Sequence, residues 1–445
     1  MKHNDDRNVV LVDGCRTPFM RSGTEYFDLI SYDLGRTVLK GLLTRTELEP
    51  HKVDRVIMGT VVQNVRTSNV ARDAALGAGF PVSVPAHTVT MACISSNQAI
   101  TSGVDLIRTG QADIVIAGGV ETLSDAPPQF DKDMRKRLYE TQKYKNPLEY
   151  RKFLQGLSPS DLLPTAPSVS EYSTGEVMGE SADKLAATFG VSREAQDAYA
   201  LRSHHAAAAA TEAGKLDPEL LPTAVPPKFK PLEHDNTFRA DTSLEKLSTL
   251  KPVFVKPFGT VTAGNSSPLT DGAAATLLMA EETAEALGYT PAAYLRHYTY
   301  VAQDPKDELL LGPAYAMPQV FDAAGITFGD VDVIEFHEAF AGQVLAVLTA
   351  VESDEFAREK LGRKERIGDV DMDKINPWGG SLSLGHPFGA TGARLVTTAA
   401  HRLHVEDKQI ALVTACAAGG LGHAMLLERY EGGSYTEISK NGGQA

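Results

Sequence analysis

The chain contains few cysteines for its length. Among 445 residues there are three, Cys15, Cys93 and Cys416, and they lie far apart. Their odd number and wide spacing exclude a disulfide framework and CxxC-type metal sites, and they predict reduced thiols. The twelve histidines form no HxxxH pattern and no Cys/His cluster at ligand spacing, so no metal site is expected.

Long apolar runs and an excess of positive charge are also missing. No segment approaches the roughly 18 to 20 consecutive apolar residues of a membrane-spanning helix. The first residues, MKHNDDRN, have neither the apolar core of a signal peptide nor the composition of a transit segment. Forty-three Lys and Arg against 57 Asp and Glu give a formal charge of −14, which argues against nucleic acid as the main partner. These absences predict a cytoplasmic protein.

What is present is an alternation of short apolar runs and amphipathic segments. Runs rich in Val and Ile predict buried strands at 8–14, 54–62, 112–119, 331–336 and 409–415. Residues 31–45, 96–110 and 391–404 carry apolar side chains three to four positions apart, as amphipathic helices do. The alternation predicts an α/β fold with mainly parallel sheets.

One short plan occurs twice: a reactive residue flanked by Gly or Ser, a helix, a buried strand and a Gly-rich turn. The first copy runs through MACISSNQAI, ADIVIAGG and VETLS, and the second through LSLGHPFGATGAR, QIALVTA and CAAGGLG. Such a repeat predicts two similar layered domains that face each other.

Residues 124–254 differ in composition from the rest of the chain, with many prolines and an Ala-rich helix. They are expected to form an inserted loop or lid domain. Within the insertion, Lys132 to Lys152 hold eight Lys and Arg against three acids. Two interpretations of this basic stretch stand: a solvated face, or a dock for an anionic surface such as a CoA phosphate, a lipid headgroup or a partner subunit. The tail, 433–445, is expected to be flexible.

Four chemically reactive positions stand out. Cys93 precedes a predicted helix start, where the helix dipole and free N–H groups would lower a thiol pKa. His386 lies on a Gly-rich turn beside a proline, a reasonable place for a general base. Cys416 leaves a buried strand into a Gly-rich turn. His337 and Glu338 end another apolar strand, where α/β proteins place their sites.

The motifs around these residues resemble those of the thiolase family, over essentially the whole chain. TVTMACISSNQA, AGGVETLSD, GTVTAGNSSPLTDGAAA, HEAFAGQ, NPWGGSLSLGHPFGATGAR and ACAAGGLGHAM follow one another in the thiolase order. HEAF, where many thiolases have Asn-Glu-Ala-Phe, together with EYSTGEVMG, ALRSH and DPKDELLLGP, most resembles the β subunit of the fatty-acid-oxidation trifunctional complex, a 3-ketoacyl-CoA thiolase.

The resemblance implies roles for the reactive residues. Cys93 would be the nucleophile that carries the acyl group, His386 the base that takes its proton, and Cys416 the acid that protonates the departing acetyl-CoA carbanion. The backbone N–H groups of Cys93 and Ala418 would form one oxyanion hole. His337 replaces the Asn that holds a water in the other hole, so it either holds that water or donates directly.

The resemblance also implies the binding partners and the domain boundaries. Ser267 would contact the pantetheine arm of CoA, and Met178 and Phe340 would line the tunnel. No permanent cofactor is expected, with coenzyme A as co-substrate. The N-terminal thiolase domain would comprise 1–123 and 255–282, and the C-terminal domain 283–432. Thiolases are usually dimers or tetramers, and a hydratase/dehydrogenase α subunit or a peripheral membrane contact would suit the basic insertion.

Alternative functions share parts of this pattern. A short-chain acetoacetyl-CoA thiolase has the same catalytic set and differs in substrate length. A ketoacyl synthase shares the fold and the nucleophile but uses two histidines, whereas Cys416 is the acid–base group here. A catalytically silent acyl-CoA-binding scaffold is disfavoured by the complete set of Cys93, His386 and Cys416.

Overall fold

Strands from both ends of the chain form one large sheet in the computed structural model, which describes residues 7–165 and 170–431. The predicted tail, 433–445, lies outside the described residues. The strands are β1 (Val9–Arg16), β2 (Met20–Arg21), β3 (Arg55–Gly59), β4 (Ala86–Val89), β5 (Ile114–Glu121), β6 (Thr223–Val225), β7 (Lys230–Leu232), β8 (Thr270–Ala280), β9 (Ala293–Ala302), β10 (Val333–Phe336), β11 (Ile410–Ala417) and β12 (Leu421–Arg429). All five strands expected from apolar runs are present.

Helices fill the connections between these strands. They are α1 (Ser31–Thr46), α2 (Val70–Ala78), α3 (Ser95–Arg108), α4 (Lys132–Thr141), α5 (Tyr150–Leu154), α6 (Met178–Thr188), α7 (Arg193–Glu212), α8 (Leu244–Ser248), α9 (Glu281–Ala286), α10 (Gly312–Ala324), α11 (Ala341–Val351), α12 (Asp354–Lys360), α13 (Ser381–Leu384) and α14 (Thr391–Val405). The three amphipathic segments are α1, α3 and α14. Within the described part of the chain, none of these helices combines the length and apolar character needed to cross a bilayer.

The sheet order shows that the repeat is real. In the first half β1 pairs with β8, β8 with β5, and β5 with β3. In the second half β9 pairs with β12, β12 with β11, and β11 with β10, which is the same connectivity. The two halves join where Val10 and Leu11 of β1 pair with Tyr294 and Ala293 of β9.

The expectation of mainly parallel sheets is wrong. Parallel pairs lie only toward the two ends of this sheet, between β3 and β4, β3 and β5, and β10 and β11, while the other main pairs are antiparallel. The missed strands explain the error. The central β8 reads TDGAAATLLMA, and its alanines are poor strand formers by propensity. They suit a strand buried on both faces beside Gly118 and Gly119 of β5.

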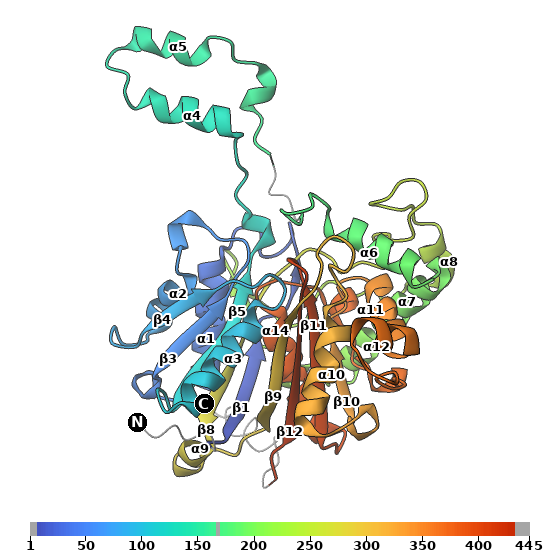
Figure 1. Ribbon diagram of the computed structural model, residues 1–445. Helices are drawn as coiled ribbons and strands as arrows, with labels where there is room; N and C mark the ends of the chain where they lie inside the picture. The colour runs from blue at the N-terminus through green and yellow to red at the C-terminus, as the bar shows by residue number, and fades with distance from the viewer. Residues whose placement is uncertain (1–6, 166–169, 432–445) are drawn as a thin grey trace.

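Helices and strands alternate in layers. α1 and α2 cover one face of the first-half strands, and α10 and α11 cover one face of the second-half strands. Between the two sets of strands lie α3 and α14, which contact each other and share one apolar core (Figure 1). This is the expected arrangement of two similar α/β layers that face each other, and it brings the N-termini of α3 and α14 together.

The inserted segment does not fold as one unit. α4 and α5 form an arm, residues 129–165, that projects away from the sheet (Figure 1), closed at its neck by mutual hydrogen bonds of 2.9 Å between Gln129 and Thr165. α6, α7 and α8 instead pack beside the second half. The part after the arm is the one that packs against the body in the described structure.

Candidate functional site

Cys93 lies on a tight turn between β4 and α3. Ala92 has a φ of 47°, in the left-handed region that non-glycine residues rarely adopt. Ser95 supports this turn, since its hydroxyl accepts a 2.8 Å hydrogen bond from the Met91 N–H and donates to the Ala92 carbonyl at 2.6 Å. The turn presents the Cys93 side chain, which is only half-buried, at the start of α3.

Two backbone N–H groups, those of Ala418 and of Cys93 itself, lie near the Cys93 sulfur and favour its ionised form. Burial nevertheless raises the pKa of this thiol to about 11, and the two N–H groups offset the rise only in part. The expectation that the helix start leaves Cys93 with a lowered pKa is therefore wrong. The resting side chain is a thiol, so its use as a nucleophile requires a base.

His386 can supply that base. Its Nδ1 is 2.6 Å from the hydroxyl of Thr391, and this hydroxyl donates its own hydrogen to the Pro387 carbonyl at 3.0 Å. The Thr391 oxygen must therefore accept from Nδ1–H, which leaves the lone pair on Nε2. Burial, followed by repulsion from His337 and Arg394, places the pKa of His386 well below 6.5, so the imidazole is neutral.

His337 follows β10, and its Nδ1 is also anchored by a hydroxyl. Its Nδ1 is 2.9 Å from the Ser381 hydroxyl, and the Arg394 guanidinium, which can only donate, lies 3.1 Å from the same oxygen. The Ser381 oxygen keeps one lone pair and one hydrogen, so it can accept from Nδ1–H or donate to Nδ1, and the second arrangement carries the ring proton of His337 on Nε2. Burial lowers the pKa of His337 to about 3, so this ring is neutral, and in the second arrangement its Nε2 is a donor.

These side chains converge on one point. The sulfur of Cys93 and one ring nitrogen each of His337 and His386 all lie within 4.8 Å of one another. The two imidazole centroids are 4.1 Å apart. Within the described residues, neither Nε2 atom has a hydrogen-bond partner. A nucleophile, a base and a neutral donor thus face the same small space.

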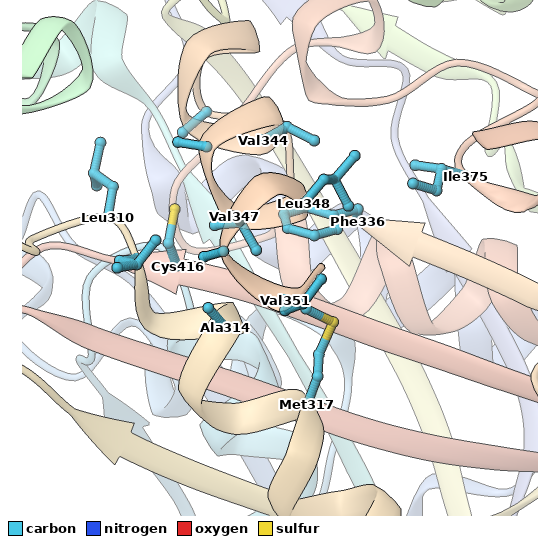
Figure 2. Close-up of a cluster of buried hydrophobic side chains, with 14 of the residues drawn as sticks. Leu310, Ala314, Met317, Phe336, Val344, Val347, Leu348, Val351, Ile375 and Cys416 are labelled. Atoms are coloured by element: carbon cyan, nitrogen blue, oxygen red, sulfur yellow. The ribbon is translucent and has the colours of Figure 1, made fainter. Parts of the chain in front are cut away.

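Cys416 approaches this point from an apolar side. Its thiol, at the end of β11, is fully buried among Leu310, Ala314, Val344 and Val347 (Figure 2). Burial, and then the nearby Cys93, raises the pKa of Cys416 well above 9. The thiol therefore keeps its proton until a basic centre develops beside it, as a proton donor to carbon requires.

Sequence reasoning missed Glu121, the last residue of β5. Its buried carboxylate accepts the N–H groups of Val61 at 3.0 Å and Val62 at 2.9 Å from the first half, and of Gly389 at 2.9 Å from the His386 loop. It thereby joins the two loops of the site. Burial raises the pKa of Glu121 to about 7, although the hydrogen bonds from these N–H groups act to lower it. The VETLSD motif contained this residue, but its role depends on loops far away in sequence.

The residues predicted to bind CoA lie around this centre. The Ser267 N–H donates to the Ala339 carbonyl at 3.0 Å, and Ser266 forms an isolated antiparallel β-bridge with Phe340. Met178 and Phe340 pack in the same apolar cluster as Cys416, and Phe340 meets the Phe254 ring edge-on at 6.0 Å. Phe340 is thus a core residue next to the site and Met178 a partly buried one packed against the same cluster, and their contact with a ligand stays a prediction.

A pocket of about 310 Å³ opens beside the Ser266–Ser267 segment. Its lining combines apolar groups such as Leu250 and Pro268 with the cationic Arg21 and Arg239, and with Lys246, which forms a 2.7 Å ion pair with Asp241 of the same lining. Leu269, one residue further on, pairs with His386 in a parallel bridge. A short stretch of backbone therefore runs from the cationic pocket to the point where Cys93, His337 and His386 meet.

Comparisons with known proteins identify the family and the fold. One family model, described as thiolase, N-terminal domain, matches residues 9–282, and another, thiolase, C-terminal domain, matches 289–429. Among solved structures, the Bacillus anthracis acetyl-CoA acetyltransferase superposes with a TM-score of 0.83 at 33% identity, covering 96% of this chain and 100% of that one. Human mitochondrial 3-ketoacyl-CoA thiolase in complex with CoA superposes with a TM-score of 0.80 at 31% identity, covering 95% and 98%.

Curated relatives are more similar still. The trifunctional enzyme subunit beta, mitochondrial, of Bos taurus is 56% identical over 95% of this chain and 89% of its own. A probable 3-ketoacyl-CoA thiolase of Caenorhabditis elegans is 54% identical over 95% and 94%. The mammalian relatives are named as mitochondrial proteins, a finding that contradicts the cytoplasmic location expected from the first residues.

Proposed function

The chain belongs to the thiolase family, and from that premise we propose that it is a 3-ketoacyl-CoA thiolase, an acyltransferase of fatty acid β-oxidation. It would cleave a 3-ketoacyl-CoA with CoA to acetyl-CoA and an acyl-CoA two carbons shorter. The observation that carries the proposal is the convergence of Cys93, His386 and Cys416, one nucleophile, one base and one separate acid.

The first half of the reaction uses all three groups. The Cys93 sulfur attacks the 3-keto carbon while its proton moves to the His386 Nε2 lone pair. The C2–C3 bond then breaks, its electron pair stays with the acetyl-CoA enolate, and Cys416 protonates C2. The products are acetyl-CoA and an acyl-thioester on Cys93. Because both thiols are protonated at rest, no proton has to come from solvent.

The second half regenerates the enzyme. A CoA thiol loses its proton to a basic group of the site, and its sulfur attacks the acyl carbon bound to Cys93. The carbon–sulfur bond to Cys93 breaks, the new acyl-CoA leaves, and the Cys93 sulfur recovers a proton. Cys416, left as a thiolate by the first half, is the base that restores this balance.

Negative oxygen develops in both halves, and two sets of donors face it. The N–H groups of Cys93 and Ala418, which lie near the sulfur, suit the oxyanion of the tetrahedral intermediates. The Nε2–H of His337 suits the enolate oxygen directly, without a bridging water. The cationic pocket lined by Arg21, Arg239 and Lys246 would hold the anionic end of CoA, with Ser267, Met178 and Phe340 along the path of its arm.

The test is CoA-dependent thiolysis, followed through the 3-ketoacyl-CoA enolate absorbance with acetoacetyl-CoA and a long-chain substrate in parallel. Faster cleavage of the long chain is the expected result. Preference for acetoacetyl-CoA would mark a short-chain thiolase instead. No turnover of either, with Cys93 reacting no faster with iodoacetamide than Cys15, would leave an acyl-CoA-binding scaffold.

The projecting arm supports a further part of the proposal, a contact with an anionic membrane surface. Basic residues on the arm, such as Lys132, Lys136 and Lys143, are exposed, and so are the apolar side chains of Leu148 and Leu154, at 70% and 63%. Cationic and apolar groups together favour a lipid interface.

Charge reversal tests this contact. Replacing Lys132, Lys136 and Lys143 by Glu should strongly reduce sedimentation with vesicles that contain anionic lipid. The matched control replaces three exposed lysines of the body, Lys228, Lys364 and Lys408, and should bind as the wild type does. Equal binding by both triple variants would contradict the proposal.

We also propose an assembly. Relatives named as beta subunits favour a complex with an α subunit that carries hydratase and dehydrogenase activities, built on a homodimer or tetramer of this chain. Co-expression with such a subunit, followed by mass measurement in solution by light scattering, distinguishes a mixed complex from a homo-oligomer or a monomer.

A further inference from the structure

Cys93, His337 and His386 have a property that the thiolase reaction does not use. Their sulfur and ring nitrogens lie within 4.8 Å of one another, although the three residues come from separate loops. One cysteine and two histidines are ligands that Zn²⁺ prefers, and zinc commonly takes three protein ligands and one open position. A tetrahedral zinc holds such ligands roughly 3.5 Å apart, so small side-chain rotations would bring these three together.

The two imidazoles are also held as metal ligands are held. Each Nδ1 is fixed by a hydroxyl, Thr391 at 2.6 Å and Ser381 at 2.9 Å, while each Nε2 is buried and has no hydrogen-bond partner among the described residues. In metal sites the second ring nitrogen is usually anchored in this way, because the anchor fixes the direction of the ring. His337 and His386 are 0% and 3% exposed, so water reaches them poorly.

We propose that Cys93, His337 and His386 form a reversible inhibitory site for Zn²⁺. The ion binds the Cys93 sulfur, whose proton is released to solvent, and the lone pair of His386 Nε2. The His337 proton moves from Nε2 to Nδ1, and the Ser381 hydroxyl rotates to accept it. Three metal–ligand bonds form and one proton leaves. The half-open side of Cys93 provides the fourth position for a water.

Zinc in this position blocks the enzyme because it occupies the nucleophile, the base and the oxyanion donor together. An acyl group on Cys93 removes the sulfur ligand, so acylated enzyme should not bind the ion. His337 decides the affinity. An amide at this position would leave only two strong ligands, Cys93 and His386, and a two-ligand site holds zinc weakly.

The experiment measures binding in the absence of substrate, so its outcome is independent of the proposed reaction. Full-length protein is dialysed against buffered ZnCl₂, and bound metal is counted. Cys93 alkylation by iodoacetamide is then followed by mass spectrometry with and without the metal. We expect one zinc per chain and protection of Cys93, with affinity reduced at least about 10-fold in His337→Asn.

Two matched variants serve as controls. His423→Asn changes another buried histidine whose Nε2 has no partner among the described residues, and Cys416→Ser removes the neighbouring thiol. Both should bind zinc as the wild type does. Loss of binding in Cys416→Ser, or unchanged binding in His337→Asn, would overturn the proposal.

A second measurement covers the case in which His337→Asn does not fold. Co²⁺ in place of Zn²⁺ should give the wild-type protein a sulfur-to-cobalt charge-transfer band and tetrahedral ligand-field bands. Cys93→Ala should lose the charge-transfer band. Persistence of that band in Cys93→Ala would assign the sulfur to another cysteine and refute the site.

Discussion

The loop before α3 and the loop before α14 occupy equivalent positions in the two halves of the fold, yet they provide different chemistry. The first presents Cys93 half-buried on a strained turn, with the thiol protonated. The second holds His386 almost completely buried, with Nδ1 fixed and Nε2 free. The repeated plan supplies two helix N-termini that meet, and we propose that Cys93 on one acts as the nucleophile and His386 on the other as the base.

The two loops depend on each other for their positions. A Cβ at Gly119, in the first half, would overlap the Gly389 carbonyl of the second, and a Cβ at Gly392 would overlap the Asn97 side chain. Glu121 adds a hydrogen bond across the same boundary. Neither half therefore contains a complete site by itself. A substitution that disturbs the boundary should reduce activity before it unfolds either half.

Removing the nucleophile should have the largest effect. Cys93→Ala deletes the sulfur that lies within 4.8 Å of a ring nitrogen of both histidines, so thiolysis should fall by at least about 10⁴-fold while the fold persists. The measurement is steady-state thiolysis with circular dichroism and Tm as controls for folding. Retained turnover would contradict the assignment of the first loop as the nucleophile loop.

Glu121→Ala should come next. It leaves the N–H groups of Val61, Val62 and Gly389 without their acceptor, so the His386 loop shifts relative to Cys93. A misplacement of about 1 Å costs on the order of 10²-fold in rate, and we expect a fall in kcat of that size. Glu121→Gln keeps one acceptor oxygen and should fall between the variant and the wild type.

Glu121 acts as a positioning residue, and temperature distinguishes this role from a role in fold stability alone. If it only stabilised the fold, the fall in kcat would disappear at low temperature, where the variant is fully folded. Persistence of the defect in protein shown to be folded supports positioning, and full recovery on cooling speaks against it.

The local sequence predicted many of the elements and loops around the site, because short residue patterns are enough to indicate strands, helices and turns. Cys93, His386 and Cys416 each sit at the junction of an apolar run and a small-residue turn, and the structure brings all three together. The apolar runs also predicted β1, β3, β5, β10 and β11. Patterns of this kind identify elements and loops, whereas the expectation that these residues share one site came from the resemblance to thiolases.

The sequence failed where the outcome depends on contacts between distant segments. β8 is rich in alanine because it is buried on both faces, so propensity did not reveal it. The raised pKa of Cys93 reflects burial by the second half, which a helix start cannot disclose. The suitability of Cys93, His337 and His386 as metal ligands was missed, because ligand spacing was sought within one segment, whereas the three come from separate loops.

Packing at the boundary gives the third prediction. Gly119→Ala places a methyl group against the Gly389 carbonyl, and overpacking of this kind costs about 1–3 kcal/mol. We expect a lower denaturation midpoint and a reduced kcat in the same variant. Gly329→Ala is the matched control, because its Cβ would meet only the Thr327 hydroxyl at 3.5 Å. Equal stability of the two variants would contradict close packing between the halves.

The last prediction concerns the effect of acid on stability, and it depends on residues of the second half alone. His423 of β12 is fully buried and donates through Nδ1 to the Thr299 carbonyl at 3.0 Å. Burial lowers its pKa to about 3. Below its ordinary pKa of 6.5 the unfolded chain binds a proton on this ring that the folded chain does not bind, so acidification favours unfolding.

The sign and size of the effect follow from this difference. From pH 6 down to pH 4, His423 should lower the free energy of unfolding by about 1.4 kcal/mol per pH unit. His423→Asn keeps a donor for the Thr299 carbonyl but does not titrate, so its stability curve should be flatter by that slope. Denaturant unfolding at several pH values measures both curves. Parallel curves would mean that His423 takes up its proton in the folded state, and that water reaches this buried ring of the second half.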